Sequence, residues 1–189
     1  MTRPDHSSGT ERVAEVASWP EFAGYDVIVN VQGDEPYLTR EILQGAAAFV
    51  EGGIYPLGTA ACVANPAALG DPSVVKVVTD ARARALYFSR APIPFLRDMS
   101  DIAQRDTLVR QHIGVYAYTP AALARWVALP PHPLEMIERL EQLRAIANGL
   151  AMGVALAAPG DGGGIDTEGD LAVANARWRD TTPISAGIQ

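Results

Sequence analysis

The sequence predicts an α/β fold, with a mixed sheet flanked by helices, because strand-like and helix-like patterns alternate along the chain. Valine and isoleucine fill residues 27–31 except Asn30, and a helical pattern follows at 40–51, where apolar residues recur every three or four positions. The strand-like run at 111–118 is followed in the same way by a helical pattern at 120–129. Such β-then-α units are typical of a sheet covered by helices.

The first strand is a nearly continuous apolar run, residues 27–31, that ends in polar side chains. Runs of this kind favour a strand that is buried on both faces, as in a parallel sheet. Gln32, Asp34 and Glu35 follow, and ligands of open α/β sheets bind outside the carboxyl ends of the strands. We therefore expect a functional site here, with a solvated acidic turn as the alternative.

Capping residues predict where the helices begin. Ser8 or Thr10 is expected to cap a short helix near the N-terminus, and Thr39 to cap the helix after the first strand. Thr119 precedes a proline, and this pair is typical of the start of a helix.

Further patterns complete the set of expected elements. We expect a strand at 57–64. The apolar runs at 74–78 and 85–89 predict two more strands, which are expected to pair as an antiparallel hairpin. Residues 98–106 are polar and predict a mobile loop, while 134–147 show the clearest helical pattern.

The C-terminal part of the chain predicts three segments. A short strand is expected at 154–157, then a last helix for which Thr167 resembles the cap, and then a flexible tail at 181–189. We therefore expect residues 1–180 to form one domain.

The composition restricts the classes of partner. The 189-residue chain has 48% hydrophobic residues and a formal net charge of -7, which fits one domain with a real core and argues against a nucleic-acid or membrane-surface protein. No window approaches the roughly 18 consecutive apolar residues of a membrane helix, and the N-terminus lacks the apolar core of a signal peptide. The single cysteine, Cys62, lies in an apolar run and is interpreted as a core thiol. We expect a cytoplasmic protein whose partners are small molecules.

The strand at 111–118 places three chemically distinct residues on one face. His112, Gly114 and Tyr116 alternate along it, and side chains of a strand alternate between its faces. A glycine between two polar rings is expected to leave a hollow that a ligand can fill. The alternative for His112 is a purely structural role.

Glu141 falls within the apolar stripe of the helix predicted at 134–147. Leu134, Ile137 and Leu140 mark that stripe, and Glu141 lies four residues after Ile137. A buried carboxylate is costly unless something pairs with it. We expect a functional role for Glu141, with a salt bridge at the edge of the helix as the alternative.

Two carboxylates on separate loops, Asp34 and Asp166, are the ligands that a hard cation such as Mg²⁺ prefers. Asp166 follows the glycine-rich residues 160–164 and precedes the last helix, so capping that helix is its alternative role. The glycine run lacks the lysine and serine of a P-loop and the spacing of a dinucleotide-binding motif. We expect it to be a flexible turn.

Several motifs occur in an order that a known family shares. They are SGTER, VIVNVQGDEP, KVV-D---ALYFSRAPIP, R-HIGVYAY, PLE-IE-LEQLR and a glycine-rich turn before IDT. With them the chain resembles the 3-deoxy-manno-octulosonate (KDO) cytidylyltransferases, or CMP-KDO synthetases, from residue 1 to about 178. The resemblance implies a Rossmann-like nucleotide-diphospho-sugar transferase fold, a homodimer, and transfer of CMP from CTP to KDO for lipopolysaccharide biosynthesis. A cytidylyltransferase for another acidic sugar is the alternative.

The resemblance also implies roles for individual residues. Asp34 and Asp166 would hold the magnesium that joins the triphosphate to the sugar, and Arg3 would lie near the cytosine. The residues implied to bind KDO are Arg12, Gln32, His112, Tyr116, Glu141 and Gln142.

One motif of the family is missing from this chain. Its members begin with a strand and a Ser-x-Arg-Leu-Pro-Gly-Lys loop that grips the CTP phosphates, and this sequence has no such loop. From the resemblance we expect residues 1–180 to be a nucleotidyltransferase domain without its N-terminal strand and helix units, and the 189-residue form to be inactive. A non-catalytic fragment that still binds the sugar is the other alternative. The flank of the strand at 27–31 is then expected to be exposed.

Overall fold

The computed structural model describes residues 1–6, 8–35, 38–158, 164–165 and 168–180. The helices are α1 (Gly9–Ala17), α2 (Arg40–Glu51), α3 (Ile102–Leu108), α4 (Pro120–Val127), α5 (Pro133–Glu138), α6 (Gln142–Ala147) and α7 (Glu168–Asp180). The strands are β1 (Ile28–Val31), β2 (Leu57–Val63), β3 (Lys76–Thr79), β4 (Ala85–Ser89), β5 (Arg110–Tyr118) and β6 (Met152–Leu156). The predicted cap Thr167, most of the glycine run and the predicted tail at 181–189 lie outside the described residues.

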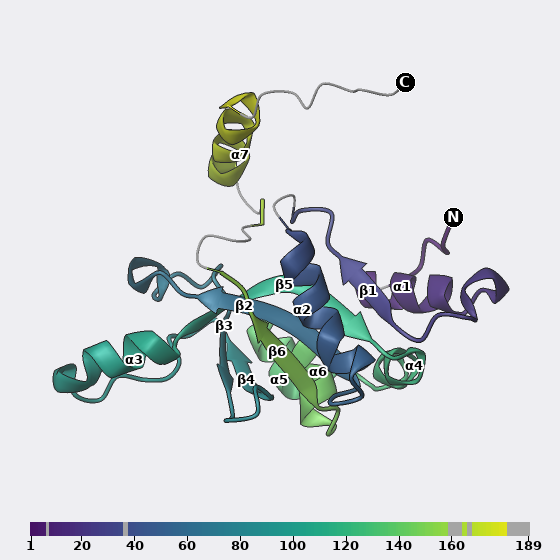
Figure 1. Ribbon diagram of the computed structural model, residues 1–189, viewed down its shortest axis with the longest axis horizontal. Coiled ribbons are helices and arrows are strands. Elements are labelled where there is room, and N and C mark those ends of the chain that lie inside the picture. The colour runs from purple at the N-terminus through teal and green to yellow at the C-terminus, as the bar shows by residue number, and fades with distance from the viewer. Residues whose placement is uncertain (7, 36–37, 159–163, 166–167, 181–189) are drawn as a thin grey trace.

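The strands form one mixed sheet (Figure 1). β5 pairs antiparallel with β1, β2 and β3, while β3 pairs antiparallel with β4, and β2 runs parallel to β6. The pairing of β3 with β4 confirms the predicted hairpin. The predicted α/β fold with a mixed sheet is therefore confirmed.

The interpretation of the first strand as parallel and buried on both faces is wrong. β1 pairs antiparallel with β5, with Ile28 opposite Tyr118. Val29 is 39% exposed and Val31 is 49% exposed. In the described part of the chain β1 pairs with β5 and with no other strand, so the other edge of β1 has no strand beside it. This agrees with the exposed flank that the sequence led us to expect. An apolar run predicts a strand but not its neighbours, because β-branched residues suit any pleated surface.

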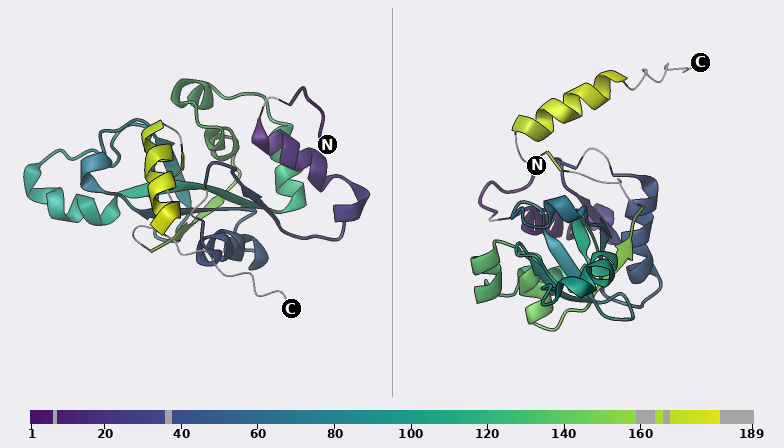
Figure 2. Two further views of the ribbon diagram at one scale, coloured as in Figure 1. Left: turned by 90° about the horizontal axis from the view of Figure 1, so that it is seen from above. Right: turned by 90° about the vertical axis from the view of Figure 1, so that its left-hand side faces the viewer.

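Helices cover both faces of the sheet and give it two cores (Figures 1 and 2). α2 packs on β2, β5 and β6, and the core beneath it contains Cys62, as predicted. α1, α4 and α6 lie over the opposite face, around the fully buried side chains of Tyr118 and Trp126. Gly58 permits the close approach of α2 to β2, since a Cβ there would lie 1.9 Å from the Ala46 carbonyl oxygen.

Three predicted helix caps are confirmed, and of the two candidates for the first helix it is Ser8, not Thr10, that caps it. The side chains of Ser8, Thr39 and Thr119 each accept a hydrogen bond from the backbone N–H three positions further along. Each cap satisfies a donor that the first turn of a helix leaves without a partner.

The segment 134–147 forms two helices, α5 and α6, so the prediction of a single helix was wrong. Arg139 adopts the left-handed conformation, with φ of 54°, and such a residue commonly ends an α-helix. Leu140 is buried, but Ile137 is 79% exposed and Leu134 is 36% exposed. The predicted apolar stripe therefore does not continue across the break.

Residues 99–106 are helical, and the prediction of a mobile loop was wrong. A 3-10 helix at Met99–Asp101 leads into α3. The Asp98 carboxylate accepts a hydrogen bond from the Ser100 N–H and begins the 3-10 turn. The polar composition of this segment reflects an exposed helix, since α3 has no fully buried residue.

Candidate active site

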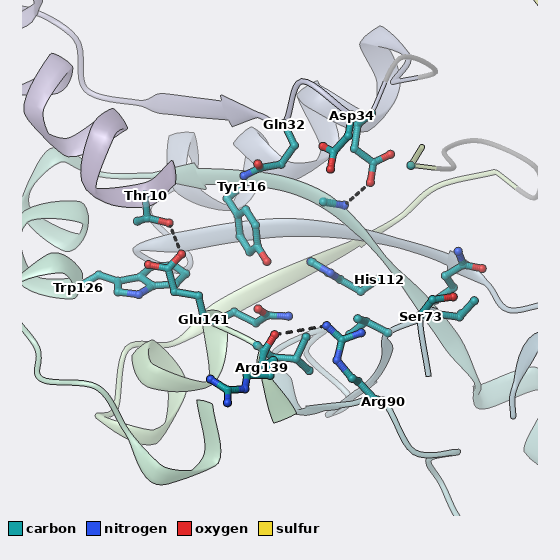
Figure 3. A pocket seen from close by; sticks show the side chains of 18 residues that line it. Thr10, Gln32, Asp34, Ser73, Arg90, His112, Tyr116, Trp126, Arg139 and Glu141 are labelled. Atoms are coloured by element: carbon teal, nitrogen blue, oxygen red, sulfur yellow. Dashed lines mark hydrogen bonds between the residues drawn. The ribbon is translucent and has the colours of Figure 1, made fainter. Parts of the chain in front are cut away.

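A polar cleft of about 580 Å³ lies over the sheet on the face opposite α2 (Figure 3). It is bounded by the end of β1, the middle of β5, the loop before β3, the end of β4 and the turn between α5 and α6. The predicted site residues that line it are Gln32, Asp34, His112, Tyr116, Glu141 and Gln142.

The predicted shared face of β5 is confirmed, but the hollow at Gly114 is not open. His112, Gly114 and Tyr116 all line the cleft, and the centroids of the two rings lie 5.4 Å apart. The Gly114 N–H donates to Glu35 Oε1 at 3.1 Å, and a Cβ on residue 114 would lie 2.9 Å from that oxygen. The glycine thus makes room for a carboxylate of the protein itself.

The two rings on β5 are uncharged. His112 Nε2 lies 2.9 Å from Thr59 Oγ1, and the ring of Phe88 packs edge-on against the imidazole. Burial lowers the pKa of His112 to about 4, because a low-dielectric surrounding disfavours the imidazolium. Burial, and next the proximity of Tyr118, raises the pKa of Tyr116 well above its ordinary value. At neutral pH both rings therefore act as neutral hydrogen-bonding groups.

Glu141 has the partners that its position requires. One carboxylate oxygen accepts a hydrogen bond from Ser8 Oγ and the other from Thr10 Oγ1, both at 2.9 Å. Ser8 and Thr10 lie at the N-terminus of α1, where the helix dipole also favours an anion. These two hydrogen bonds offset the free-energy cost of partly burying the carboxylate. They take the place of the salt bridge that we gave as the alternative role.

Asp34 lies exposed at the rim of the cleft, just after β1 (Figure 3). Its backbone carbonyl accepts a hydrogen bond from the Ile165 N–H at 2.8 Å. This bond fastens Ile165 to the Asp34 loop, although Asp166 itself lies outside the described residues. Among the residues that the structure describes, no three His, Cys, Asp or Glu side chains form a metal-binding cluster.

Arg3 and Arg12 do not line the cleft. The Arg12 guanidinium donates to Thr2 Oγ1 at 3.1 Å and to the Arg3 carbonyl at 3.2 Å. Arg3 pairs with Glu15 of α1, with Nε 3.4 Å from the carboxylate. The structure therefore does not bring these two predicted residues together with the others.

Two arginines of the cleft were missed by sequence reasoning. The Arg90 guanidinium donates to the carbonyls of Pro72 at 2.7 Å and Glu138 at 2.8 Å, which ties the loop before β3 to the end of α5. Arg139 lies in the turn after α5 (Figure 3). Arg90 follows an apolar strand directly, as Gln32 does, and this signal was available in the sequence.

A buried lysine holds the same wall of the cleft together. Lys76 is fully buried in β3, and its ammonium donates to the carbonyls of Asp71, Val74 and Arg90. The three donors of a lysine are thus matched by three acceptors. Burial lowers the pKa of Lys76, and the nearby Asp71 opposes that effect.

The fold is that of a nucleotidyltransferase. A solved structure of CMP:2-keto-3-deoxy-manno-octonic acid synthetase complexed with CTP matches this chain with a TM-score of 0.82 and 34% identity, over 95% of this chain and 71% of that one. A putative glucose-1-phosphate thymidylyltransferase from Bacillus anthracis shares the fold, with a TM-score of 0.55 at 14% identity over 96% of this chain and 65% of that one.

Sequence comparison identifies the family of nucleotidyltransferases to which the chain belongs. The family model described as cytidylyltransferase matches residues 1–152. The 3-deoxy-manno-octulosonate cytidylyltransferase of Gemmatimonas aurantiaca is 60% identical over 178 residues, covering 94% of this chain and 69% of that protein. The enzyme of the same name from Saccharophagus degradans is 43% identical over 181 residues, covering 90% of this chain and 70% of that protein. The chain belongs to the cytidylyltransferase family.

Proposed function

We propose that this chain is a CMP-KDO synthetase, which transfers CMP from CTP to the anomeric hydroxyl of KDO and releases pyrophosphate, for lipopolysaccharide biosynthesis. The observation that carries the proposal is the 60% identity to the Gemmatimonas aurantiaca KDO cytidylyltransferase across 94% of this chain. The cleft supports it, because neutral rings and carboxylates suit a sugar with many hydroxyls.

We assign KDO binding in the cleft to Gln32, His112, Tyr116, Glu141 and Gln142, all of which line it. His112 and Tyr116 are uncharged at neutral pH, so they exchange hydrogen bonds with hydroxyls without attracting phosphate. Glu141 uses two acceptor positions for hydroxyls of α1, and a carboxylate has about four. The remaining positions are available to sugar hydroxyls.

We assign magnesium to Asp34 and Asp166. Asp34 offers exposed carboxylate oxygens beside the cleft, and the Ile165 N–H, one residue before Asp166 in the sequence, donates to the Asp34 carbonyl. Magnesium uses one or two protein carboxylates together with waters and substrate phosphates. When bound, it would withdraw charge from the α-phosphate and favour attack by the anomeric hydroxyl.

We also propose that Arg12 recognises the sugar carboxylate and that Arg3 lies near the cytosine. Arg139, by contrast, lines the cleft, and its planar fork suits a carboxylate as well as that of Arg12 does. Calorimetry of KDO binding to Arg12→Ala and Arg139→Ala distinguishes the two arginines, because only loss of the true carboxylate ligand should weaken binding strongly.

We also propose a cytoplasmic homodimer. No helix in the described part of the chain is long and apolar enough to cross a bilayer. Phe95, Met136 and Ile137 are 84%, 50% and 79% exposed, and large apolar side chains left in contact with solvent are candidates for cover by another subunit. Light scattering after size exclusion tests the dimer, and a monomeric mass at micromolar concentration would contradict it.

The proposed reaction is tested by phosphorus NMR of CTP, KDO and Mg²⁺ incubated with the complete gene product. We expect a new phosphodiester signal from CMP-KDO and an equal amount of pyrophosphate. Pyrophosphate without the phosphodiester, or no reaction at all, would overturn the proposal.

A further inference from the structure

A buried hydroxyl lies directly behind His112 in the neighbouring strand. Thr59 of β2 is fully buried. Its Oγ1 lies 2.7 Å from the Val115 carbonyl oxygen and 2.9 Å from His112 Nε2. The Thr59 hydroxyl therefore contacts β5 twice. One contact is with the Val115 carbonyl, and the other is with the imidazole of His112, which lines the cleft.

An irregularity in the sheet creates this contact. Thr59 lies opposite Tyr116, but the next residue, Ala60, lies opposite Ile113. The two additional residues of β5 form a bulge, and bulges interrupt the regular ladder of hydrogen bonds. The Thr59 hydroxyl supplies a donor to the Val115 carbonyl at this point.

The number of protons fixes the direction of both hydrogen bonds. A hydroxyl has one proton to donate. The Val115 carbonyl can only accept, so the Thr59 proton points to it. The Thr59 oxygen must then accept from His112 Nε2, which requires that Nε2 carry a proton.

The second ring nitrogen of His112 is consequently an acceptor. Because burial lowers the pKa of His112 to about 4, the neutral ring carries a single N–H, and Nδ1 keeps its lone pair. In the described part of the chain the imidazole of His112 makes its hydrogen bond to Thr59 through Nε2 and makes none at Nδ1. The ring lines the cleft (Figure 3), so this acceptor is available to a ligand.

We propose that Thr59 is a positioning residue that fixes His112 as the Nε2–H tautomer and so presents Nδ1 as an acceptor to a hydroxyl of the sugar substrate. The identity of the ligand rests on the proposed function, whereas the tautomer depends on the protein alone. A carboxylate or phosphate oxygen at Nδ1 would face a lone pair, and only a donor is favoured there. This part of the cleft therefore selects the hydroxyl side of KDO over its carboxylate and over the phosphates of CTP.

The tautomer is tested by two-bond proton–nitrogen NMR of the ¹⁵N-histidine-labelled chain. The chain has three histidines, and His112→Gln identifies the signal of His112. We expect the pure Nε2–H pattern in the wild type and in Thr59→Ser, which keeps the hydroxyl, and a mixture of the two neutral tautomers in Thr59→Val, where the ring has lost its fixed partner. An Nδ1–H wild type, or a Thr59→Val spectrum equal to that of the wild type, would overturn the positioning role.

The effect on the substrate is tested by steady-state kinetics of the complete gene product. We expect Thr59→Val to raise the KM for KDO about tenfold, the loss of roughly one hydrogen bond, with the KM for CTP unchanged. Thr59→Ser should restore the wild-type value. Equal increases for both substrates, or none, would overturn the role in sugar selection. A wild type that never responds to KDO would instead refute the proposed function, and the NMR result would still decide the role of Thr59.

Discussion

The carboxylate of Glu141 accepts a hydrogen bond from the Thr10 hydroxyl at 2.9 Å, although 131 positions separate the two residues. Ser8 donates to the other carboxylate oxygen. These bonds fasten the N-terminus of α1 to the turn between α5 and α6, where both Thr10 and Glu141 line the cleft. A negative charge is thereby held in a fixed place beside the proposed sugar site.

Replacing Glu141 by Gln removes the charge and keeps one acceptor oxygen. We expect the KM for KDO to rise about fivefold, because hydrogen bonds to an ionised acceptor are stronger by roughly 1 kcal/mol. Kinetics with KDO and CTP varied separately measure the effect. Thr10→Val is the matched control, since it removes one hydrogen bond of Glu141 but leaves its charge. An unchanged KM for KDO in Glu141→Gln would show that Glu141 is only structural.

Gly114→Ala should displace the Glu35 carboxylate, because the new Cβ would lie 2.9 Å from its Oε1. We expect the free energy of unfolding to fall by about 1 kcal/mol, because moving the carboxylate breaks its hydrogen bond from the Gly114 N–H. Gly70→Ala is the control, as nothing lies within 4 Å of a Cβ at that position. Urea unfolding of both variants measures the difference, and equal stability would contradict the close contact at residue 114.

Mild acid should destabilise the fold through His112. Its pKa is about 4 in the folded chain and 6.5 without the protein surroundings. Between these pH values the unfolded chain binds a proton here that the folded chain does not, so the free energy of unfolding falls as the pH falls. The loss approaches about 3 kcal/mol near pH 4.

His112→Gln is the matched variant for the pH experiment, because its amide still donates to Thr59 but does not titrate. We expect the loss of stability between pH 6.5 and 4 to be smaller in this variant, with His6 and His132 present in both proteins. Identical slopes in urea unfolding across this range would show that His112 is not the group responsible.

Asp34→Asn should abolish turnover and leave the fold intact. Asp34 is exposed, and the hydrogen bond that it receives from Ile165 involves its backbone. Asp98→Asn is the control, since asparagine also caps a helix well. Pyrophosphate release at increasing Mg²⁺, with circular dichroism as a check on folding, measures the effect. Full activity of Asp34→Asn at ordinary Mg²⁺ would remove Asp34 from the metal site.

Local contacts made much of the fold predictable from the sequence. The caps Thr39 and Thr119 were predicted correctly, and Ser8 was one of two candidates for the first cap, because each bonds within one turn of its own helix. The predicted pairing direction of β1 was wrong, because it is set by β5, which lies far along the chain. The break at Arg139 was missed, since a left-handed arginine has no signature in its residue type.

The site was predictable where a single element defines it. Alternation along β5 identified His112 and Tyr116 as neighbours on one face. The partners of Glu141 come from another helix, so the sequence predicted a need for pairing without naming Thr10. Thr59 gave no signal at all, because its contact with His112 arises from a bulge between two strands.

Pyrophosphate release from CTP by the complete gene product, with Mg²⁺ present, tests the proposed function most directly. The assay compares KDO, no sugar and sialic acid. We predict release that requires KDO and saturates with its concentration. Release at the same rate with sialic acid, or without any sugar, would contradict the assignment of this chain as a CMP-KDO synthetase.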